Sequence, residues 1–134
     1  MLSQRYKYIE IPVDISSKMT ELESDLTGDS LEDIYAADNC IEFIYVTKND
    51  EYIGHISFKN LDLSYDIYML VISPNQQRQG YATLLLNAIK DKMNILEVNA
   101  NNDNAISFYK KENFTVERIL KKYYPSGDGL FMRR

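Results

Sequence analysis

Residues 68–89 read Y-M-L-V-I-S-P-N-Q-Q-R-Q-G-Y-A-T-L-L-L-N-A-I, and this stretch decides the predicted fold. Its first five residues are apolar, and they predict a buried strand that ends at Ile72. Pro74 stops that strand, because proline lacks an N–H and restricts the residue before it. From Gly80 onward, apolar residues at positions 82, 85, 86, 89 and 93 predict a helix that runs to about Lys92.

The junction between this strand and this helix is a candidate phosphate site. The first N–H groups of a helix have no partner within the helix and carry the positive end of its dipole. Such groups bind phosphate when the approach is open, and Gly80 and Ala82 are both small. Arg78 adds a positive charge beside them. A tight turn that needs glycine only for its geometry is the alternative, and spacing alone does not separate the two.

The remaining chain predicts a mixed α/β sheet, with antiparallel strands first and crossover helices later. The predicted strands span residues 6–11, 41–47, 52–58, about 64–72, 95–99, 114–120 and 130–134. Three other helices are predicted. The first is capped by Asp14 or Ser16 and ends at about residue 25. The second spans residues 31–37 after a cap at Asp29 or Ser30, and the third is capped by Asn102 or Asp103 and ends at about residue 112. Asn113 follows the last helix, and asparagine accepts the left-handed conformation that ends many helices.

Length and composition predict one globular domain that spans residues 1–134. No run of about eighteen apolar residues exists, and the N-terminus lacks the apolar core of a signal peptide, so we expect no membrane span. Cys40 is the single cysteine, which excludes an internal disulfide and fits a reducing, cytoplasmic setting. With one cysteine and one histidine, the chain is not expected to hold a zinc ion.

Charge is distributed unevenly along the chain. Residues 1–66 carry five Lys and Arg against fourteen Asp and Glu, whereas residues 67–134 carry ten against six. The basic half contains the candidate phosphate site, and the acidic half could attract a basic polypeptide, although solubility explains such a balance as well. Nucleic acid is not an expected partner for a chain with an isoelectric point near 4.9.

Several segments of the chain resemble one enzyme family. Residues 77–82, Q-R-Q-G-Y-A, resemble the acetyl-CoA pyrophosphate loop of the GNAT N-acetyltransferases, and residues 70–74 resemble their fourth strand. Four further segments resemble one branch of this family, which acetylates the N-terminal alanine of ribosomal proteins. They are L-E-V-N-A-N-N (96–102), A-I-S-F-Y (105–109), N-F (113–114) and K-Y-Y-P-S-G-D-G (122–129). This likeness runs from about Tyr68 to the C-terminus. In the first half of the chain only the architecture is similar.

The resemblance implies a GNAT fold, in which a central mixed sheet is flanked by about four helices. It also implies direct transfer of an acetyl group from acetyl-CoA to an amine in a ternary complex, without a metal. A protein N-terminus is the expected acceptor, and a monomer or weak dimer is the expected state. A small amine or polyamine is an alternative acceptor, and a catalytically silent CoA-binding domain is an alternative of another class.

The resemblance also assigns residues to the cofactor. Backbone groups of one strand are expected along the pantetheine arm and thioester, and these belong to Leu70, Val71 and Ile72. The pyrophosphate loop is expected to comprise Gln77, Arg78, Gln79, Gly80, Tyr81, Ala82 and Thr83. Asn102 is expected to contact the cofactor through its side chain, and it is also suited to capping the following helix.

Two residues match the catalytic positions of the family. Glu97 matches the proposed proton acceptor, although the pattern alone favours a solvated carboxylate on one face of a strand. Tyr109 matches the proton donor, and a phenol with a pKa near 10 suits that task, although a tyrosine on a helix is more often a core residue. His55, a lone histidine in a strand, is interpreted as structural or solvated rather than catalytic. Cys40 has no base near it in the sequence, so we do not expect it to form an acyl-enzyme.

Tyr123 and Tyr124 are predicted to form part of the acceptor wall, within a hairpin loop at residues 123–129. Simple anchoring of the hairpin is an equally good interpretation, since aromatic residues serve cores and interfaces alike. The connection after Gly80 is shorter than the family leads us to expect, and the chain has no tryptophan. These departures fall near the acceptor groove, so they bear on the acceptor more than on the cofactor.

Overall fold

The structure is a computed structural model that describes residues 1–29 and 31–134. Within this described part, the strands form one mixed sheet in the order β1-β2-β3-β4-β5-β7-β6. The strands are β1 (Tyr6–Lys7), β2 (Ile41–Lys48), β3 (Glu51–Asn60), β4 (Ser64–Ile72), β5 (Met93–Asn99), β6 (Thr115–Tyr124) and β7 (Gly127–Arg133). The helices are α1 (Val13–Thr27), α2 (Glu32–Ala37), α3 (Tyr81–Asn87) and α4 (Asp103–Lys111), with 3-10 turns η1 (Tyr8–Glu10) and η2 (Pro74–Gln76). The predicted α/β class is confirmed.

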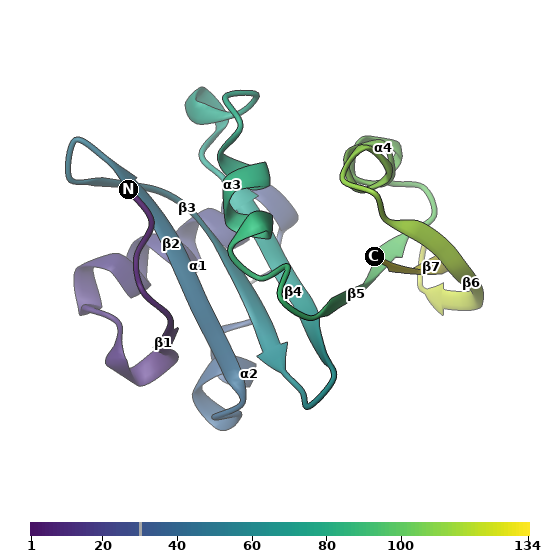
Figure 1. Cartoon of the computed structure of the whole chain (residues 1–134), viewed down its shortest axis with the longest axis horizontal. Coiled ribbons are helices and arrows are strands. Elements are labelled where there is room, and N and C mark those ends of the chain that lie inside the picture. The colour runs from purple at the N-terminus through teal and green to yellow at the C-terminus, as the bar shows by residue number, and fades with distance from the viewer. Residues whose placement is uncertain (30) are drawn as a thin grey trace.

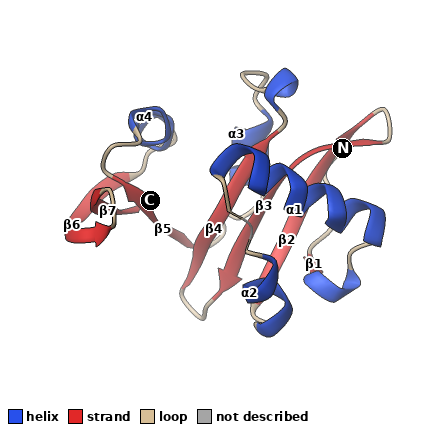
Figure 2. Cartoon of the chain, turned by 180° about the vertical axis from the view of Figure 1, so that it is seen from behind, coloured by secondary structure: helices blue, strands red, loops and turns tan. Residues whose placement is uncertain are grey.

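The helices cover both faces of the sheet. Figures 1 and 2 show α1 and α2 on one face and α3 on the opposite one. Buried residues beneath α1 and α2 form one apolar cluster, which comprises Ile11, Met19, Tyr35, Ile41 and Phe43. The larger cluster lies on the other face, where Leu85, Leu86 and Ile89 pack on the sheet and Ile106, Phe108 and Tyr109 of α4 join them. Each fully buried leucine contributes roughly 1.5–3 kcal/mol, so burial of these faces holds the layers together.

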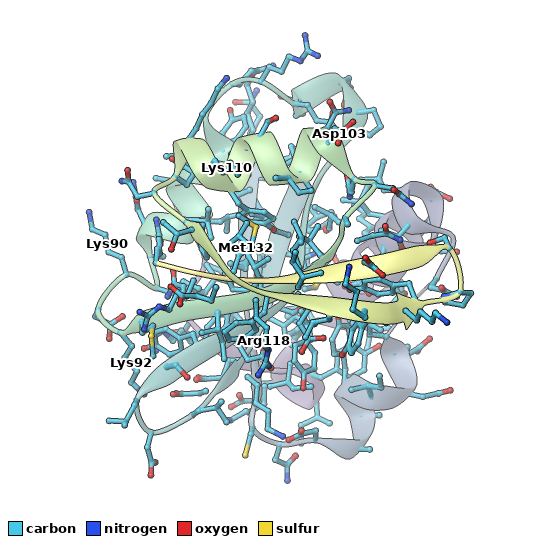
Figure 3. The ribbon with its side chains drawn as sticks, turned by 90° about the vertical axis from the view of Figure 1, so that its right-hand side faces the viewer. Lys90, Lys92, Asp103, Lys110, Arg118 and Met132 are labelled. Atoms are coloured by element: carbon cyan, nitrogen blue, oxygen red, sulfur yellow. The ribbon has the colours of Figure 1, made fainter. Side chains whose placement is uncertain are left out.

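Helix α4 and the last hairpin form one side of the molecule. Figure 3 shows α4, from Asp103 to Lys110, lying over the β6–β7 hairpin, with Met132 between them and Arg118 on the opposite side. Met132 is fully buried, and the Arg118 guanidinium lies 5.5 Å from the centre of the Phe131 ring. The hairpin pairs with β5 through β7, so it extends the sheet at this side.

The N-terminal elements differ from the prediction in their boundaries. The first strand ends at Lys7, because the chain turns into η1, where the Glu10 carboxylate accepts the Lys7 N–H at 2.6 Å. Helix α1 begins at Val13 after Pro12, so neither Asp14 nor Ser16 is its cap. Helix α2 begins at Glu32, with Leu31 rather than Asp29 in the cap position. The other predicted cap, Ser30, lies outside the described residues.

Helix α3 is shorter than predicted. It ends at Asn87, and Met93 belongs to β5 rather than to the helix. Carbonyl groups at and after its end accept hydrogen bonds from distant side chains, because Arg134 Nη2 donates to Leu86 O at 2.8 Å and Asn94 Nδ2 donates to Ile89 O at 2.8 Å. These bonds satisfy groups that a longer helix would have satisfied internally.

The last hairpin also differs, since Tyr123 and Tyr124 lie in β6 and not in a loop. The pairing of β6 with β7 is irregular between Leu120 and Tyr124, and Lys122 has a left-handed φ of 51°. The predicted left-handed cap at Asn113 is confirmed, with a φ of 71°. In the described residues, no helix has the length and apolar character that crossing a membrane requires, and no group of His, Cys, Asp and Glu is arranged to hold a metal.

Candidate functional site

A β-bulge in β4 organises the candidate site. Ser57 of β3 pairs with Met69 and the next residue, Phe58, pairs with Ile67, so Tyr68 is the extra residue. Bulges bend a strand and re-aim its side chains. The pairing of β4 with β5 covers only Ser64 to Asp66, so the β5 side of β4 is unpaired from the bulge onward. Beyond this point the bent strand is free to face a ligand on that side (Figure 1).

A cavity of about 500 Å³ lies where β4 leads into α3. Its lining combines one strand, the following loop, the first turn of α3 and the facing side of α4. The lining residues are Leu70, Ile72, Gln76, Gln77, Arg78, Gly80, Tyr81, Ala82, Thr83, Asn104 and Phe108. We call this the cofactor cavity. One apolar end and one end of backbone amides and a cationic side chain suit a long ligand that carries phosphate.

The loop residues have the geometry that anion binding requires. Gly80 has a φ of 86°, and no atom lies within 4 Å of the point where a side chain would begin, so the space beside its backbone is open. Arg78 has a φ of 63°, which is uncommon for a residue other than glycine, and such strain gathers at functional sites. Gln77 Nε2 donates to Ile72 O at 3.0 Å and thereby fixes the loop to the end of β4.

One buried polar atom in the cofactor cavity supports a polar ligand there. Gln76 Oε1 is buried and has no hydrogen-bond partner among the described residues. A buried acceptor without a partner costs about 1–3 kcal/mol, so a ligand that donates a hydrogen bond would remove this cost. This oxygen suits an N–H or O–H group of a ligand, whereas the open backbone at Gly80 and the charge of Arg78 suit its phosphate, so the residues fit a cofactor that carries both.

A second cavity, of about 460 Å³, lies on the face of the sheet that α2 covers. It is lined by Leu31, Ile34, Asp66, Ile67, Tyr68, Glu97, Tyr123 and Tyr124. We call this the acceptor cavity. Tyr68 of this cavity and Leu70 of the cofactor cavity are only two residues apart on β4, a spacing of roughly 7 Å along a strand. Strand β4 therefore contributes lining residues to both cavities, at and just after its bulge.

Both tyrosines of the last hairpin line the acceptor cavity because of the irregularity in β6. Consecutive residues of a regular strand point to opposite faces. Here the Tyr123 and Tyr124 rings meet edge to face, with centres 5.0 Å apart. A Cβ at Gly129 would approach both rings to about 3.0 Å, so glycine leaves the room in which they pack.

Two carboxylates set the charge of the acceptor cavity. Burial, together with the nearby charge of Glu97, raises the pKa of Asp66 to about 6. The Glu97 side chain is exposed on β5. A hydrogen bond to Glu97 raises the pKa of Tyr123 to about 12. No lysine or arginine is among the lining residues of the described part, so the cavity favours a cation.

One known protein family matches most of the chain that forms these two cavities. The family model described as "Acetyltransferase (GNAT) family" matches residues 9–114. The chain belongs to the GNAT family. The family resemblance seen in the sequence is thereby confirmed, and the segments that carried it, residues 70–74 and 77–82, contribute to the cofactor cavity.

Individual GNAT proteins are also similar to this chain in sequence and in fold. The "[Ribosomal protein bS18]-alanine N-acetyltransferase" of Escherichia coli strain K12 is 33% identical over an alignment that covers 47% of this chain and 47% of that protein. The chain thus spans about half the length of the curated relatives it matches. The crystal structure of the ribosomal-protein-S18-alanine N-acetyltransferase from Escherichia coli superposes with a TM-score of 0.80 at 20% identity, over 99% of this chain and 92% of that one.

An aminoglycoside 6'-N-acetyltransferase complexed with coenzyme A has the same fold. It superposes with a TM-score of 0.79 at 11% identity, over 98% of this chain and 96% of that chain. At such identities the superposition shows the GNAT fold alone, so it does not distinguish a peptide acceptor from a small-molecule acceptor.

The predicted cofactor residues fall into two groups. Leu70, Ile72 and most of the loop from Gln77 to Thr83 line the cofactor cavity. The other three do not line it: Val71 is buried, Gln79 is exposed, and Asn102 Oδ1 caps α4 by accepting the Ala105 N–H at 3.2 Å. Their cofactor contacts stay predictions.

Tyr109 packs between aromatic neighbours rather than lining either cavity. Its ring centre lies 5.3 Å from that of Phe108 and 5.2 Å from that of Phe114. Burial raises the pKa of Tyr109 to about 12. Phe108 lines the cofactor cavity, so Tyr109 is one residue removed from it. The proton-donor role of Tyr109 stays a prediction.

Sequence reasoning missed several cavity residues. Gln76, Asn104 and Phe108 belong to the cofactor cavity, and Leu31, Ile34, Asp66 and Tyr68 belong to the acceptor cavity. Asp66 had the clearest available signal, because an acidic residue stands between tyrosine and isoleucine in a strand. Its position near Glu97 depends on the pairing of β4 with β5, which the local pattern does not contain.

Proposed function

We propose that this GNAT protein transfers the acetyl group of acetyl-CoA to the α-amine at the N-terminus of a protein. The observation that supports this most directly is that β4 lines both cavities, with Leu70 in the cofactor cavity and Tyr68, at the bulge, in the acceptor cavity. One cavity fits a phosphate-bearing cofactor, and the other presents carboxylates and tyrosine hydroxyls to an amine. The partial identity to the ribosomal-protein-alanine N-acetyltransferase supports a protein N-terminus as the acceptor.

The cofactor supplies an activated acetyl group, and the residues of this chain bind it and move protons. The backbone N–H groups that follow Gly80, with Arg78, hold the pyrophosphate. Glu97 takes a proton from the acceptor amine, which has a pKa near 8 as an α-amine against about 10.4 for lysine. Tyr109 is assigned as proton donor by its match to the family position, and its raised pKa keeps its hydroxyl protonated at neutral pH.

The α-amine suits this site on energetic grounds. At pH 7 roughly one α-amine in ten is already neutral, whereas a lysine amine is neutral far less often. An exposed carboxylate such as Glu97 therefore has less work to do as base for an α-amine than for a lysine amine. Tyr123 and Tyr124 offer hydroxyl groups and ring faces to a peptide backbone in the same cavity.

A small polyamine is the second candidate acceptor. The observation that favours it is the pair of carboxylates, Asp66 and Glu97, in a cavity without a lining lysine or arginine among the described residues. A diamine could place one ammonium beside Asp66 and present the other to Glu97. A silent CoA-binding domain is the third candidate, and it differs from both in showing no turnover.

Acetyl transfer by the purified chain distinguishes these acceptors. CoA release is measured with acetyl-CoA and a panel of peptides that differ in their first residue, each with an α-N-blocked copy as control, and with spermidine in parallel. Turnover of free peptides only, with mass spectrometry placing the acetyl group on the α-amine, supports the proposal. Turnover of blocked peptides or of spermidine alone would contradict it, and CoA binding without turnover would indicate the silent domain.

A further inference from the structure

A cluster of polar side chains is buried between α1, α2 and β3, away from both cavities. It consists of Glu23, Tyr35, Tyr52, His55 and Ser57, and we call it the Glu23 cluster. Glu23, His55 and Ser57 have no exposed surface, and Tyr35 is 3% exposed. Glu23 Oε2 lies 2.7 Å from His55 Nε2 and 2.6 Å from the Tyr35 hydroxyl. The Tyr52 hydroxyl lies 2.6 Å from His55 Nδ1, and the Tyr35 hydroxyl lies 2.9 Å from Ser57 Oγ.

Both tyrosine hydroxyls of this cluster stay protonated and can donate hydrogen bonds. Burial, and then the charge of Glu23, raise the pKa of Tyr35 and of Tyr52, so neither ionises near neutral pH. Tyr35 donates to Glu23 Oε2, and His55 donates to the same oxygen in the tautomer that carries its proton on Nε2. The other oxygen, Glu23 Oε1, accepts the backbone N–H of Leu31 at 3.3 Å. A buried carboxylate is thus satisfied by three donors.

Such a cluster is a poor way to gain stability alone. Buried ionic pairs often contribute no more than apolar residues of the same volume, because both groups lose their hydration. The cluster instead fixes the geometry of its members, because a polar network is fully hydrogen-bonded in only one arrangement of its side chains. Its value to the protein therefore depends on which part of the molecule it orients.

The partners of Glu23 link the sheet to α2. His55 belongs to β3, whereas Leu31 and Tyr35 belong to the start and the middle of α2. Helix α2 has only six residues and no side-chain cap, so it has little stability of its own. Leu31, one of the two attachment points, and Ile34, which precedes the other, line the acceptor cavity. Among the lining residues of the cofactor cavity, none comes from α1 or α2.

We infer that Glu23, held in place by His55, is a positioning residue for the acceptor: it fixes Leu31 and Tyr35 and thereby the α2 wall of the acceptor cavity. This inference rests on the proposed function, because the cavity must receive the acceptor. Glu23 itself touches no substrate. Loss of its bonds should let α2 shift and should weaken acceptor binding, while the cofactor cavity keeps its shape.

Glu23→Gln is the first test, because glutamine keeps the volume but places an amide N–H where one acceptor oxygen stood. We expect the KM for a peptide acceptor to rise about tenfold, with kcat and the Kd for CoA within about twofold of wild type. Glu21→Gln is the matched control, since Glu21 lies on the same helix with an exposed side chain and should leave all three values unchanged. An unchanged acceptor KM in folded Glu23→Gln overturns the inference.

Tyr35→Phe keeps the test decisive if Glu23→Gln does not fold. It removes one hydroxyl and leaves Glu23 with His55 and Leu31, so we expect the acceptor KM to rise about threefold. His55→Gln, which retains one donor for Glu23, should restore acceptor binding better than His55→Leu. Equal KM values in wild type and Tyr35→Phe, or in the two His55 variants, contradict the positioning role.

Hydrogen exchange separates this inference from the proposed function. Amide exchange in residues 31–37 should be about tenfold faster in Glu23→Gln than in wild type, and unchanged in residues 77–87. If wild type acetylates no peptide while exchange responds as expected, the proposed function fails and Glu23 still orients α2. If peptides are acetylated but neither exchange nor KM responds, the proposed function stands and the inference is wrong.

Discussion

At the residue scale, the two carboxylates of the acceptor cavity differ in their surroundings. Asp66 is half-buried on β4, and Glu97 is exposed on β5. The charge of Glu97 acts on Asp66 and adds to the effect of burial. A cation bound between them would be stabilised by both charges, whereas the free protein carries their repulsion. The ionisation of Asp66 therefore opposes the folded state.

Asp66→Asn should stabilise the fold above pH 6. The folded pKa of Asp66 is about 6 and the ordinary pKa of an aspartate is 3.8, so the folded state holds the proton more strongly. Stability is then lost as pH rises from about 4 to about 6, and the loss is complete above that window. The asparagine variant avoids this loss. We expect its free energy of unfolding, relative to that of wild type, to be about 1 kcal/mol higher at pH 7 than at pH 4, a value that already includes a reduction for solvent screening.

Urea unfolding of wild type and variant at pH 4, 5, 6 and 7 measures this difference. Asp62→Asn, in the exposed turn before β4, removes the same charge and serves as control. A difference between Asp66→Asn and wild type that stays constant from pH 4 to pH 7 would show that Asp66 titrates alike in both states.

Tyr109→Phe should lower turnover by roughly 10²–10⁴-fold if Tyr109 donates a proton. Phenylalanine keeps the ring contacts with Phe108 and Phe114, so affinity for CoA should stay within about twofold. Because burial raises the pKa of Tyr109 to about 12, the wild-type rate should not fall through its ionisation up to pH 10. Single-turnover rates and calorimetric titration with CoA give both quantities, and near-wild-type turnover would leave Tyr109 as a packing residue.

At the element scale, the β4–loop–α3 unit combines a bulge, a strained loop and a short helix. The bulge ends pairing with β5, and the side chain of Gln77 holds the loop to the strand. Arg78 and Gly80, both in the left-handed conformation, line the cofactor cavity. The hairpin of β6 and β7 has a matching role on the other cavity, because its irregular strand places Tyr123 and Tyr124 together.

Gly80→Glu should abolish CoA binding, because it brings a side chain and a negative charge to the phosphate end of the cofactor cavity. Gly28→Glu is a matched control. Gly28 has a φ of 81° against 86° for Gly80, and neither position has atoms within 4 Å of an added Cβ. Both variants therefore carry similar backbone strain, roughly 1–2 kcal/mol, but only one lines the cavity. Calorimetry that finds equal CoA affinity for both variants would remove the loop from the site.

Tyr123→Ala and Tyr124→Ala should raise the KM for a peptide acceptor without weakening CoA binding. Both side chains line the acceptor cavity, and neither lines the cofactor cavity. Loss of binding that is equal in ground and transition states has this kinetic signature. Phe131→Leu, a change on the neighbouring strand outside both linings, controls for loss of an aromatic side chain from the hairpin. If steady-state kinetics gives a wild-type KM for both alanine variants, the tyrosines only anchor the hairpin.

At the scale of the whole molecule, each cavity joins segments that are distant in the chain. The cofactor cavity joins β4 and α3 to α4, and the acceptor cavity joins α2 and β4 to β5 and β6. The acidic half of the chain supplies α2 and Asp66, whereas the basic half supplies the loop with Arg78. This division places positive charge where an anionic cofactor enters and negative charge where an amine enters.

CoA should stabilise the whole domain, because a ligand that binds only the folded state shifts the unfolding equilibrium. At one hundred times its Kd the gain is about 2.7 kcal/mol, which corresponds to a rise in Tm on the order of 10 °C for a domain of this size. Pantetheine, which lacks the pyrophosphate, should give a much smaller shift. Thermal unfolding that responds equally to both ligands would argue against the phosphate site.

The local pattern of the sequence determined the elements and the phosphate loop. The apolar run that ends at Ile72, the stop at Pro74 and the left-handed cap at Asn113 follow from neighbouring residues, and the structure contains all three. The GNAT resemblance carried the family and fold, which are confirmed. The strand end, the proline stop and the cap could be predicted because each depends on residues only a few positions apart.

Only the tertiary structure decided the bulge at Tyr68, the proximity of Asp66 to Glu97, and the burial of Glu23 against His55. Glu23 and His55 are separated by 32 positions, so the local pattern around neither residue contains its partner. The end of α3 likewise involves a distant residue, since Arg134, 48 positions from Leu86, donates to the Leu86 carbonyl. Register and long-range hydrogen bonds arise when the layers pack, so no window of the sequence contains them.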